Sequence, residues 1–129
     1  MGPNKIYLGL ALTWTFVIAI MCLVSFSDMP KVSLQSADKY VHFTFHFVFT
    51  GLWFLYFESR KNELGNAKTI LLVFLLSLLY GISVEIMQGL FTVTRKADLF
   101  DVLANTTGAL TAVISILVYQ KYIAKEKSL

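Results

Sequence analysis

The stretch TILLVFLLSLLYGISVEIMQGLF, residues 69–91, decides how this chain folds. As a helix it is long enough to cross the hydrocarbon core of a bilayer, for which about 20 mainly apolar residues suffice. It carries one carboxylate, Glu85, and three residues later the amide of Gln88. An ionised side chain at the centre of a membrane helix costs roughly 2.5–3.5 kcal/mol. We therefore expect Glu85 to face other helices that supply polar partners, which predicts a bundle.

The composition of the chain is typical of a membrane protein. Of its 129 residues, 57% are hydrophobic and 15% are charged, whereas soluble domains average about 25% charged residues. Apolar runs of the length of a membrane span cover residues 6–26, 40–57, 69–91 and 102–122. Phenylalanines alternate along residues 43–49 as in a strand, but a lone strand in lipid would leave its backbone unpaired, which favours a helix. The sequence predicts an all-α membrane protein, a four-transmembrane-helix bundle that forms one domain over residues 1–129.

Basic residues set the expected orientation, because cytoplasmic segments of membrane proteins are enriched in lysine and arginine. Seven of the 11 basic residues lie at the N-terminus, in the second loop or in the C-terminal tail, and four lie in the first and third loops. We therefore expect both termini in the cytoplasm. Since topology accounts for these short basic clusters, no nucleic-acid binding is predicted. The lone Cys22 cannot form an intramolecular disulfide, and we expect it to be inert packing.

Polar residues gather at the expected outer end of the spans, and many are three or four residues apart, which places them on shared helix faces. They are Asp38, Lys39, His42 and His46 in the second span, Glu85 and Gln88 in the third, and Arg95, Asp98, Asp101 and Asn105 before or within the fourth. At 1.5 Å per residue, Glu85 and His46 each lie about 10 Å below the outer end of their spans. We expect these two side chains to face each other, and Asp98 to cap the fourth helix.

These ten residues predict an outward-facing polar pocket that binds a ligand. Arg95 can hold a phosphate or carboxylate through two hydrogen bonds, so the bound group is expected to be a lipid head group, a lipid-linked cell-wall intermediate or an amphiphilic drug. A second hypothesis is a membrane hydrolase or transferase that acts on a lipid phosphate. Glu85 would then be the general base, and His42 or His46 the acid. A structural bundle or partner subunit is the third hypothesis.

Motifs of several enzyme classes are missing from the sequence. Residues 42–46, HFTFH, have the histidine spacing of a zinc-binding helix without its glutamate, and no GxSxG elbow, P-loop or dinucleotide-binding glycine pattern is present. Two histidines four residues apart do not by themselves indicate a metal. The sequence therefore predicts neither metal nor cofactor. The side chains that can in principle surround a divalent metal are His42, His46, Glu85, Asp98 and Asp101.

The ordered combination of these residues resembles the VanZ-like family. The resemblance is carried by residues 38–43, DKYVHF, residues 85–88, EIMQ, and residues 95–101, RKADLFD, followed by Asn105 and Gly108. It extends from Asp28-Met29-Pro30 through the fourth span, with Val93 and Thr94 standing where the family often has a proline. The resemblance implies a small multi-pass protein of the bacterial cytoplasmic membrane. It also implies a relation to the cell envelope, to resistance against the lipid-tailed glycopeptide teicoplanin, and to a lipid-linked cell-wall precursor or lipoglycopeptide as partner.

Overall fold

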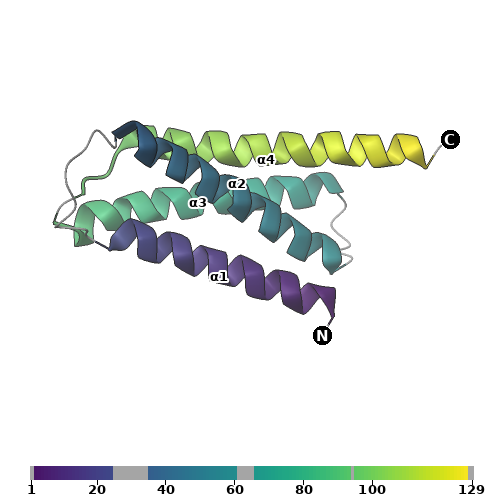
Figure 1. The fold of residues 1–129 in the computed structure, drawn as a ribbon, viewed down its shortest axis with the longest axis horizontal. Helices are drawn as coiled ribbons and strands as arrows, with labels where there is room; N and C mark the ends of the chain where they lie inside the picture. Colours follow the sequence, from purple (N-terminus) through teal and green to yellow (C-terminus); the bar gives the residue numbers. More distant parts are fainter. Residues whose placement is uncertain (1, 25–34, 61–65, 94, 128–129) are drawn as a thin grey trace.

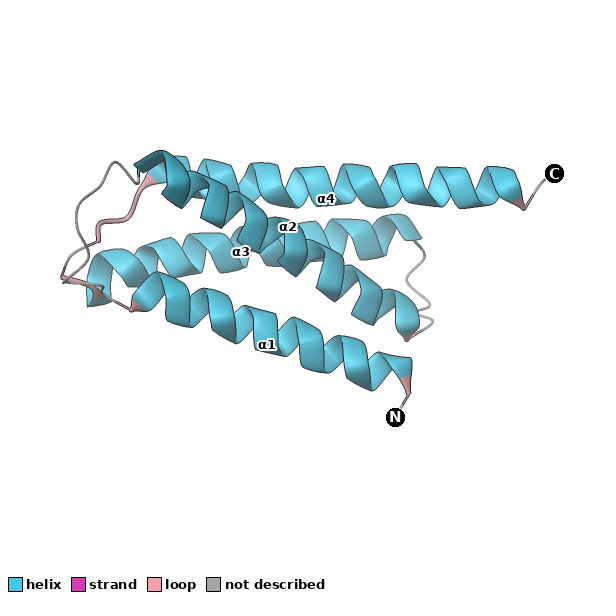
Figure 2. Cartoon of the chain, viewed as in Figure 1, coloured by secondary structure: helices cyan, strands magenta, loops and turns pink. Residues whose placement is uncertain are grey.

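The computed structural model describes residues 2–24, 35–60, 66–93 and 95–127. They form four helices, α1 (Pro3–Leu23), α2 (Gln35–Ser59), α3 (Asn66–Phe91) and α4 (Leu99–Glu126). The helices alternate in direction, so that the start of α1 and the end of α4 lie at the same end of the bundle (Figure 1). The described residues contain no strand (Figure 2). The predicted all-α fold class is confirmed, including a helix through the alternating phenylalanines.

The helix boundaries differ from the predicted spans by a few residues. The start of α2 lies five residues before the predicted span, α3 and α4 each start three residues early, and α1 ends at Leu23. Asp98 caps α4 as predicted, because its Oδ1 accepts a hydrogen bond of 2.8 Å from the backbone N–H of Phe100. This bond provides a partner for one of the unpaired donors in the first turn. Residues 28–30, where the family resemblance begins, lie outside the described residues.

Three helices, α1, α3 and α4, are long and apolar enough to cross a membrane. Their outward faces carry large apolar side chains such as Phe16, Leu79 and Val118, which are 67%, 62% and 63% exposed. Such surfaces suit contact with lipid tails rather than water. The helix α2, which contains the second predicted span, does not reach the same apolarity. Its surroundings within the bundle therefore decide how its polar side chains are accommodated.

The helix α2 lies at the centre of the bundle. Within the described residues it contacts all three other helices, α4 most extensively, whereas α1 and α4 do not contact each other. In Figure 1 it crosses obliquely in front of α3. Two apolar clusters fill the interior beside it, one formed by Ile18, Cys22, Phe49 and Val84 and the other by Phe54, Ile70 and Val73. The polar side chains of α2 are consequently covered by protein on several sides.

The helices α2 and α4 approach closely at Gly108. A Cβ atom at this position would overlap the backbone carbonyl of Phe43, which cannot move independently of α2. At Gly81 on α3, a Cβ atom would lie 3.0 Å from both Asn105 Nδ2 and His46 Cε1. Small residues allow such close contact between membrane helices, whose association depends on packing rather than on the hydrophobic effect. Both glycines thus set interhelical distances next to the polar residues.

Gly108→Ala is expected to destabilise the bundle, because α2 must move away from α4 to admit the methyl group. Overpacking of this kind typically costs about 1–3 kcal/mol. Thermal unfolding of the purified protein in lipid nanodiscs measures the effect. Gly9→Ala is the matched control, since a Cβ atom at Gly9 meets nothing within 4 Å and alanine is the better helix former. Equal unfolding temperatures for the two variants would contradict the close approach.

Candidate functional site

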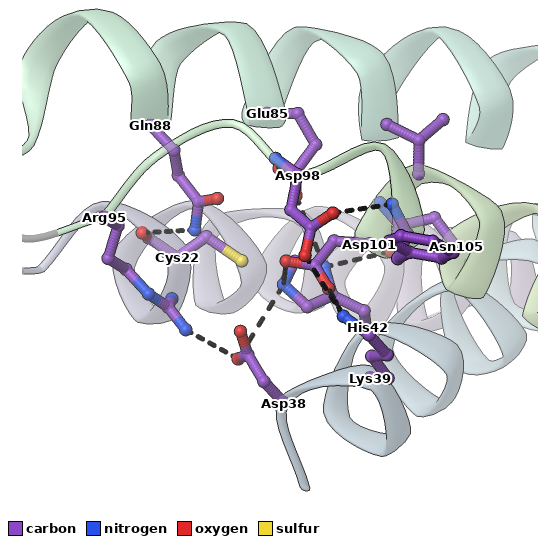
Figure 3. Close-up of polar contacts among 12 residues, drawn as sticks. Cys22, Asp38, Lys39, His42, Glu85, Gln88, Arg95, Asp98, Asp101 and Asn105 are labelled. Carbon is purple, nitrogen blue, oxygen red and sulfur yellow. Dashed lines mark hydrogen bonds and ion pairs between the residues drawn. The ribbon is translucent and has the colours of Figure 1, made fainter. Parts of the chain in front are cut away.

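Polar side chains from α2, α3, α4 and the residues before α4 meet at the end of the bundle opposite the start of α1 (Figure 3). Eight of them form a group that we call the polar cluster. Its buried members, each at most 5% exposed, are His42, Glu85, Asp101 and Asn105. Its rim members, whose side chains are 31–33% exposed, are Asp38, Lys39, Arg95 and Asp98. The chain therefore places six ionisable side chains around one buried imidazole and one buried amide.

The imidazole of His42 lies at the centre of the polar cluster. Its Nδ1 is 3.1 Å from Oδ1 of Asn105, and because a carbonyl oxygen carries no proton, Nδ1 donates this hydrogen bond. Oε1 of Glu85 lies 3.6 Å from the same nitrogen. On the other side of the ring, Nε2 faces Oδ2 of Asp101 at 3.7 Å and Oδ1 of Asp38 at 3.9 Å. Residues of three helices thus converge on one histidine.

Both basic side chains of the polar cluster are paired with carboxylates. Nζ of Lys39 donates to Oδ2 of Asp98 at 3.2 Å and to Oδ1 of Asp101 at 3.1 Å. Nη2 of Arg95 donates to Oδ1 of Asp38 at 2.6 Å. These pairs join the first turns of α2 to the loop before α4 and to the first turn of α4. An anion that binds either cation must share it with these carboxylates.

Glu85 links the end of α3 to the start of α4. Its Oε2 accepts a hydrogen bond of 3.2 Å from the backbone N–H of Asp98. Its Oε1 is buried and has no hydrogen-bond partner among the described residues, and the same is true of Nδ2 of Asn105. Buried polar atoms without partners are rare in folded proteins. The expectation that Glu85 faces polar groups of other helices therefore agrees with the structure. Only one of its two carboxylate oxygens, Oε2, has a hydrogen-bond partner among the described residues.

The expected pairing of His46 with Glu85 is wrong. Nδ1 of His46 lies 2.8 Å from Oγ of Ser77, and its ring packs beside Phe49 and Tyr80 at centroid distances of 5.9 and 6.2 Å. Because α2 begins at residue 35, it is the earlier histidine, His42, that lies about 10 Å from the helix end, level with the carboxylate. His46 is one turn deeper and lies outside the polar cluster.

Gln88 and Thr92 organise the backbone around the polar cluster. Nε2 of Gln88 donates a hydrogen bond of 2.8 Å to the backbone oxygen of Cys22, so this predicted pocket residue joins α3 to the end of α1 instead. Oγ1 of Thr92 lies 2.8 Å from the carbonyl oxygen of Gln88 and 3.0 Å from that of Arg95. The sequence did not identify Thr92 or Ser77 as partners of the candidate site residues, because serine and threonine are common in helices and their spacing alone does not indicate a hydrogen bond.

Three side chains of the polar cluster are arranged so that they could hold a metal ion. Asp38, His42 and Asp101 each offer one ligand atom, and these atoms lie within 4.8 Å of one another. This set differs from the one considered from the sequence, which included His46 and Glu85. Nε2 of His42 is the only imidazole nitrogen that faces carboxylates on two sides within the described part of the chain.

The described helices include three of membrane-spanning length and apolarity, and they enclose a buried polar cluster at one end. These features place the chain in the class of helical membrane proteins. A comparison with protein-family models matches residues 10–120 to the family described as VanZ/LLP1. The chain belongs to this family, because the match covers most of the sequence and reaches all four helices. The resemblance noted in the sequence is thereby confirmed. No curated protein and no solved structure matches the chain.

The rim carboxylate Asp98 predicts a pH-dependent contribution to stability. Its pKa is lowered from the ordinary value of 3.8, first by the Phe100 N–H and then by Lys39. The folded state therefore favours the ionised form, and the stabilisation is present above the ordinary pKa and is lost as pH falls through the lowered one. Asp98→Asn keeps a capping side chain but removes the charge, so it should unfold at a lower temperature than the wild type near neutral pH.

The measurement is thermal unfolding of both proteins in nanodiscs across the acidic range. The difference between them should shrink steadily at pH values below 3.8. A difference of constant size throughout the range would mean that the charge of Asp98 contributes nothing to stability.

Proposed function

We propose that this protein is a multi-pass protein of the bacterial cytoplasmic membrane whose polar cluster binds the head group of a lipid-linked or amphiphilic ligand at the outer face. The proposal treats α2 as a membrane span together with α1, α3 and α4, and it places both termini in the cytoplasm. The observation that carries it is the convergence of buried polar side chains at one end of a bundle whose outer surface is apolar. Intramembrane ionisable residues of this kind commonly mark binding sites or pathways.

The length and position of α2 support its assignment as a span. Its 25 residues extend about 37 Å as a helix, which exceeds the roughly 30 Å of a bilayer core. It lies alongside three helices that cover its histidines. The start of α1 and the end of α4 share one end of the bundle (Figure 1), and the basic tail of α4 suits the cytoplasmic side. The polar cluster would then face outward.

The rim of the polar cluster combines charge with exposed apolar surface. The Arg95 side chain is 31% exposed and makes one carboxylate contact among the described residues, which leaves further guanidinium donors for a phosphate or carboxylate. Nζ of Lys39 lies 5.6 Å from the ring centroid of Phe100. Large apolar side chains within six residues of Arg95 in the sequence are well exposed, namely Phe91, Val93, Leu99 and Phe100. This pairing suits an amphiphile whose head reaches the cations while its tail stays in lipid.

Arg95→Ala is expected to weaken binding of a polyprenyl phosphate to the protein in zwitterionic nanodiscs. Hydrogen bonds to charged groups contribute about 1.5–3 kcal/mol each, so the affinity should fall roughly tenfold or more. Native mass spectrometry or a filter assay with labelled lipid measures it. The uncharged polyprenol of the same length should bind the two proteins equally. Arg60→Ala is the matched control, because Arg60 contacts Tyr56 near the opposite end of α2.

Two outcomes would contradict head-group binding. One is equal phosphate-lipid affinity in Arg95→Ala and the wild type, and the other is an equal loss in Arg60→Ala. Growth of cells that carry each variant on teicoplanin tests the expected link to resistance, since that drug is itself an amphiphile. If Arg95→Ala only lowers the unfolding temperature, a structural role for the bundle is favoured instead.

A hydrolase or transferase that acts on a lipid phosphate is the second candidate, and the Glu85–His42 geometry favours it. Oε1 of Glu85 has no hydrogen-bond partner in the described part of the chain and lies 3.6 Å from Nδ1 of His42, which places a base beside an imidazole. His46 is less suited to the acid role because it lies one turn deeper, outside the polar cluster, where its Nδ1 contacts Ser77 rather than Glu85.

Glu85→Gln should abolish phosphate release from a polyprenyl phosphate if the protein is a hydrolase, because the amide cannot accept a proton. The assay is inorganic phosphate released by the purified protein in nanodiscs, with His46→Gln as the histidine control. Activity that is unchanged in Glu85→Gln would remove this carboxylate from the catalytic role. Activity that is lost only in His46→Gln would assign the catalytic role to His46 instead.

A further inference from the structure

The charges of the polar cluster do not balance. It contains four carboxylates, on Asp38, Glu85, Asp98 and Asp101, and two cations, on Lys39 and Arg95. With every carboxyl group ionised, two negative charges are left over beside a neutral imidazole. Buried charges are stable in proteins when they are paired or coordinate a metal ion. A divalent cation would neutralise this excess.

The imidazole of His42 is oriented as a metal ligand. In a neutral ring, an Nδ1–H that donates to Asn105 Oδ1 leaves the lone pair on Nε2. That lone pair points between two carboxylates, with Asp101 Oδ2 at 3.7 Å and Asp38 Oδ1 at 3.9 Å, and both distances are too long for hydrogen bonds. Histidine ligands typically donate the second ring N–H to an oxygen of this kind, which fixes the tautomer.

The separations of these atoms fit a shared ion after a small contraction. Metal–nitrogen and metal–oxygen bonds of about 2.0–2.2 Å place neighbouring ligand atoms roughly 3.0–3.6 Å apart. The two distances from Nε2 are 3.9 and 3.7 Å, and all three ligand atoms lie within 4.8 Å of one another. Oδ2 of Asp101 is also the oxygen that Lys39 does not contact, because Nζ binds Oδ1. Oδ1 of Asp38, the oxygen that faces Nε2, also accepts the Arg95 hydrogen bond, and a carboxylate oxygen has a second lone pair that can bind a cation.

Two further buried atoms support a site at this position. Oε1 of Glu85 has no hydrogen-bond partner among the described residues and lies 3.6 Å from the Nδ1 side of His42, where its charge makes the imidazole a better donor to a cation. Nδ2 of Asn105 is likewise unpartnered. Asn105, which orients His42, thus has one amide group that finds no hydrogen-bond acceptor among the described residues.

We propose that Asp38, His42 and Asp101 bind a divalent first-row metal ion such as Mn²⁺ or Zn²⁺. One imidazole and two carboxylates suit these ions, and three protein ligands leave coordination positions open on the ion. Such an ion would add positive charge where the polar cluster is otherwise negative. The site does not depend on the proposed amphiphile, since metal binding can be measured with no such ligand present.

The test uses the full chain in zwitterionic nanodiscs, stripped with a chelator and titrated with Mn²⁺ while the free-ion signal is followed by electron paramagnetic resonance. One Mn²⁺ per chain is expected, with spin-echo modulation from a ligating nitrogen, and Zn²⁺ should displace it. Asp101→Asn should weaken binding at least tenfold, and His42→Gln should abolish the nitrogen modulation. The matched controls are Glu58→Gln for a carboxylate at the far end of α2 and His46→Gln for the other histidine.

Asp38→Asn guards against misfolding of the buried variants, because Asp38 is partly exposed and pairs with Arg95, so its neutral replacement should lower the unfolding temperature less than a change at the buried Asp101. It should also weaken Mn²⁺ binding at least tenfold. The proposal is overturned if Mn²⁺ does not bind or if nitrogen modulation is absent from the wild type. It is also overturned if Asp38→Asn retains full affinity, or if the modulation disappears only in His46→Gln.

Discussion

The burial of polar side chains on α2, away from lipid, is the constraint on which the rest of this structure depends. In hydrocarbon no water is available to satisfy an imidazole or a carboxylate, so each must find partners within the protein. The bundle meets this requirement by placing its least apolar helix at the centre, in contact with all three others. His42 is then surrounded by groups from α3 and α4, while the outer faces of α1, α3 and α4 remain apolar.

Close helix approach makes this arrangement possible. Gly108 lets α4 lie directly against the carbonyl of Phe43, the residue next to His42, and this contact brings Asn105 and Asp101 within reach of the imidazole. On the opposite face of α2, Trp14 Nε1 donates a hydrogen bond of 3.0 Å to the carbonyl oxygen of Phe45. The position of the buried histidine is therefore fixed from two sides by backbone contacts, and a functional geometry follows from packing.

The electrostatics of the polar cluster differ from a simple anion-binding pocket. The sequence predicted that Arg95 binds an anionic group of a ligand, but the fold pairs both Arg95 and Lys39 with carboxylates and leaves negative charge in excess among the residues of the polar cluster. Recognition of an anionic head group at such a site requires exchange of an ion pair at the rim or an additional cation. Arg95 suits exchange, because it is partly exposed and has unused donors. The deeper groups around His42 suit a bound cation.

The sequence by itself determined the helices, their approximate bounds and the end of the bundle at which polar residues gather, because apolar length and helix periodicity are local properties. It also identified Glu85, since a carboxylate in an apolar run needs a partner. It could not determine which histidine is the partner of Glu85. A shift of about one helical turn in the start of α2 changes whether His42 or His46 lies level with Glu85. Only the tertiary structure, through the crossing of α2 and the close contact at Gly108, selected His42 and directed Gln88 to the backbone of α1.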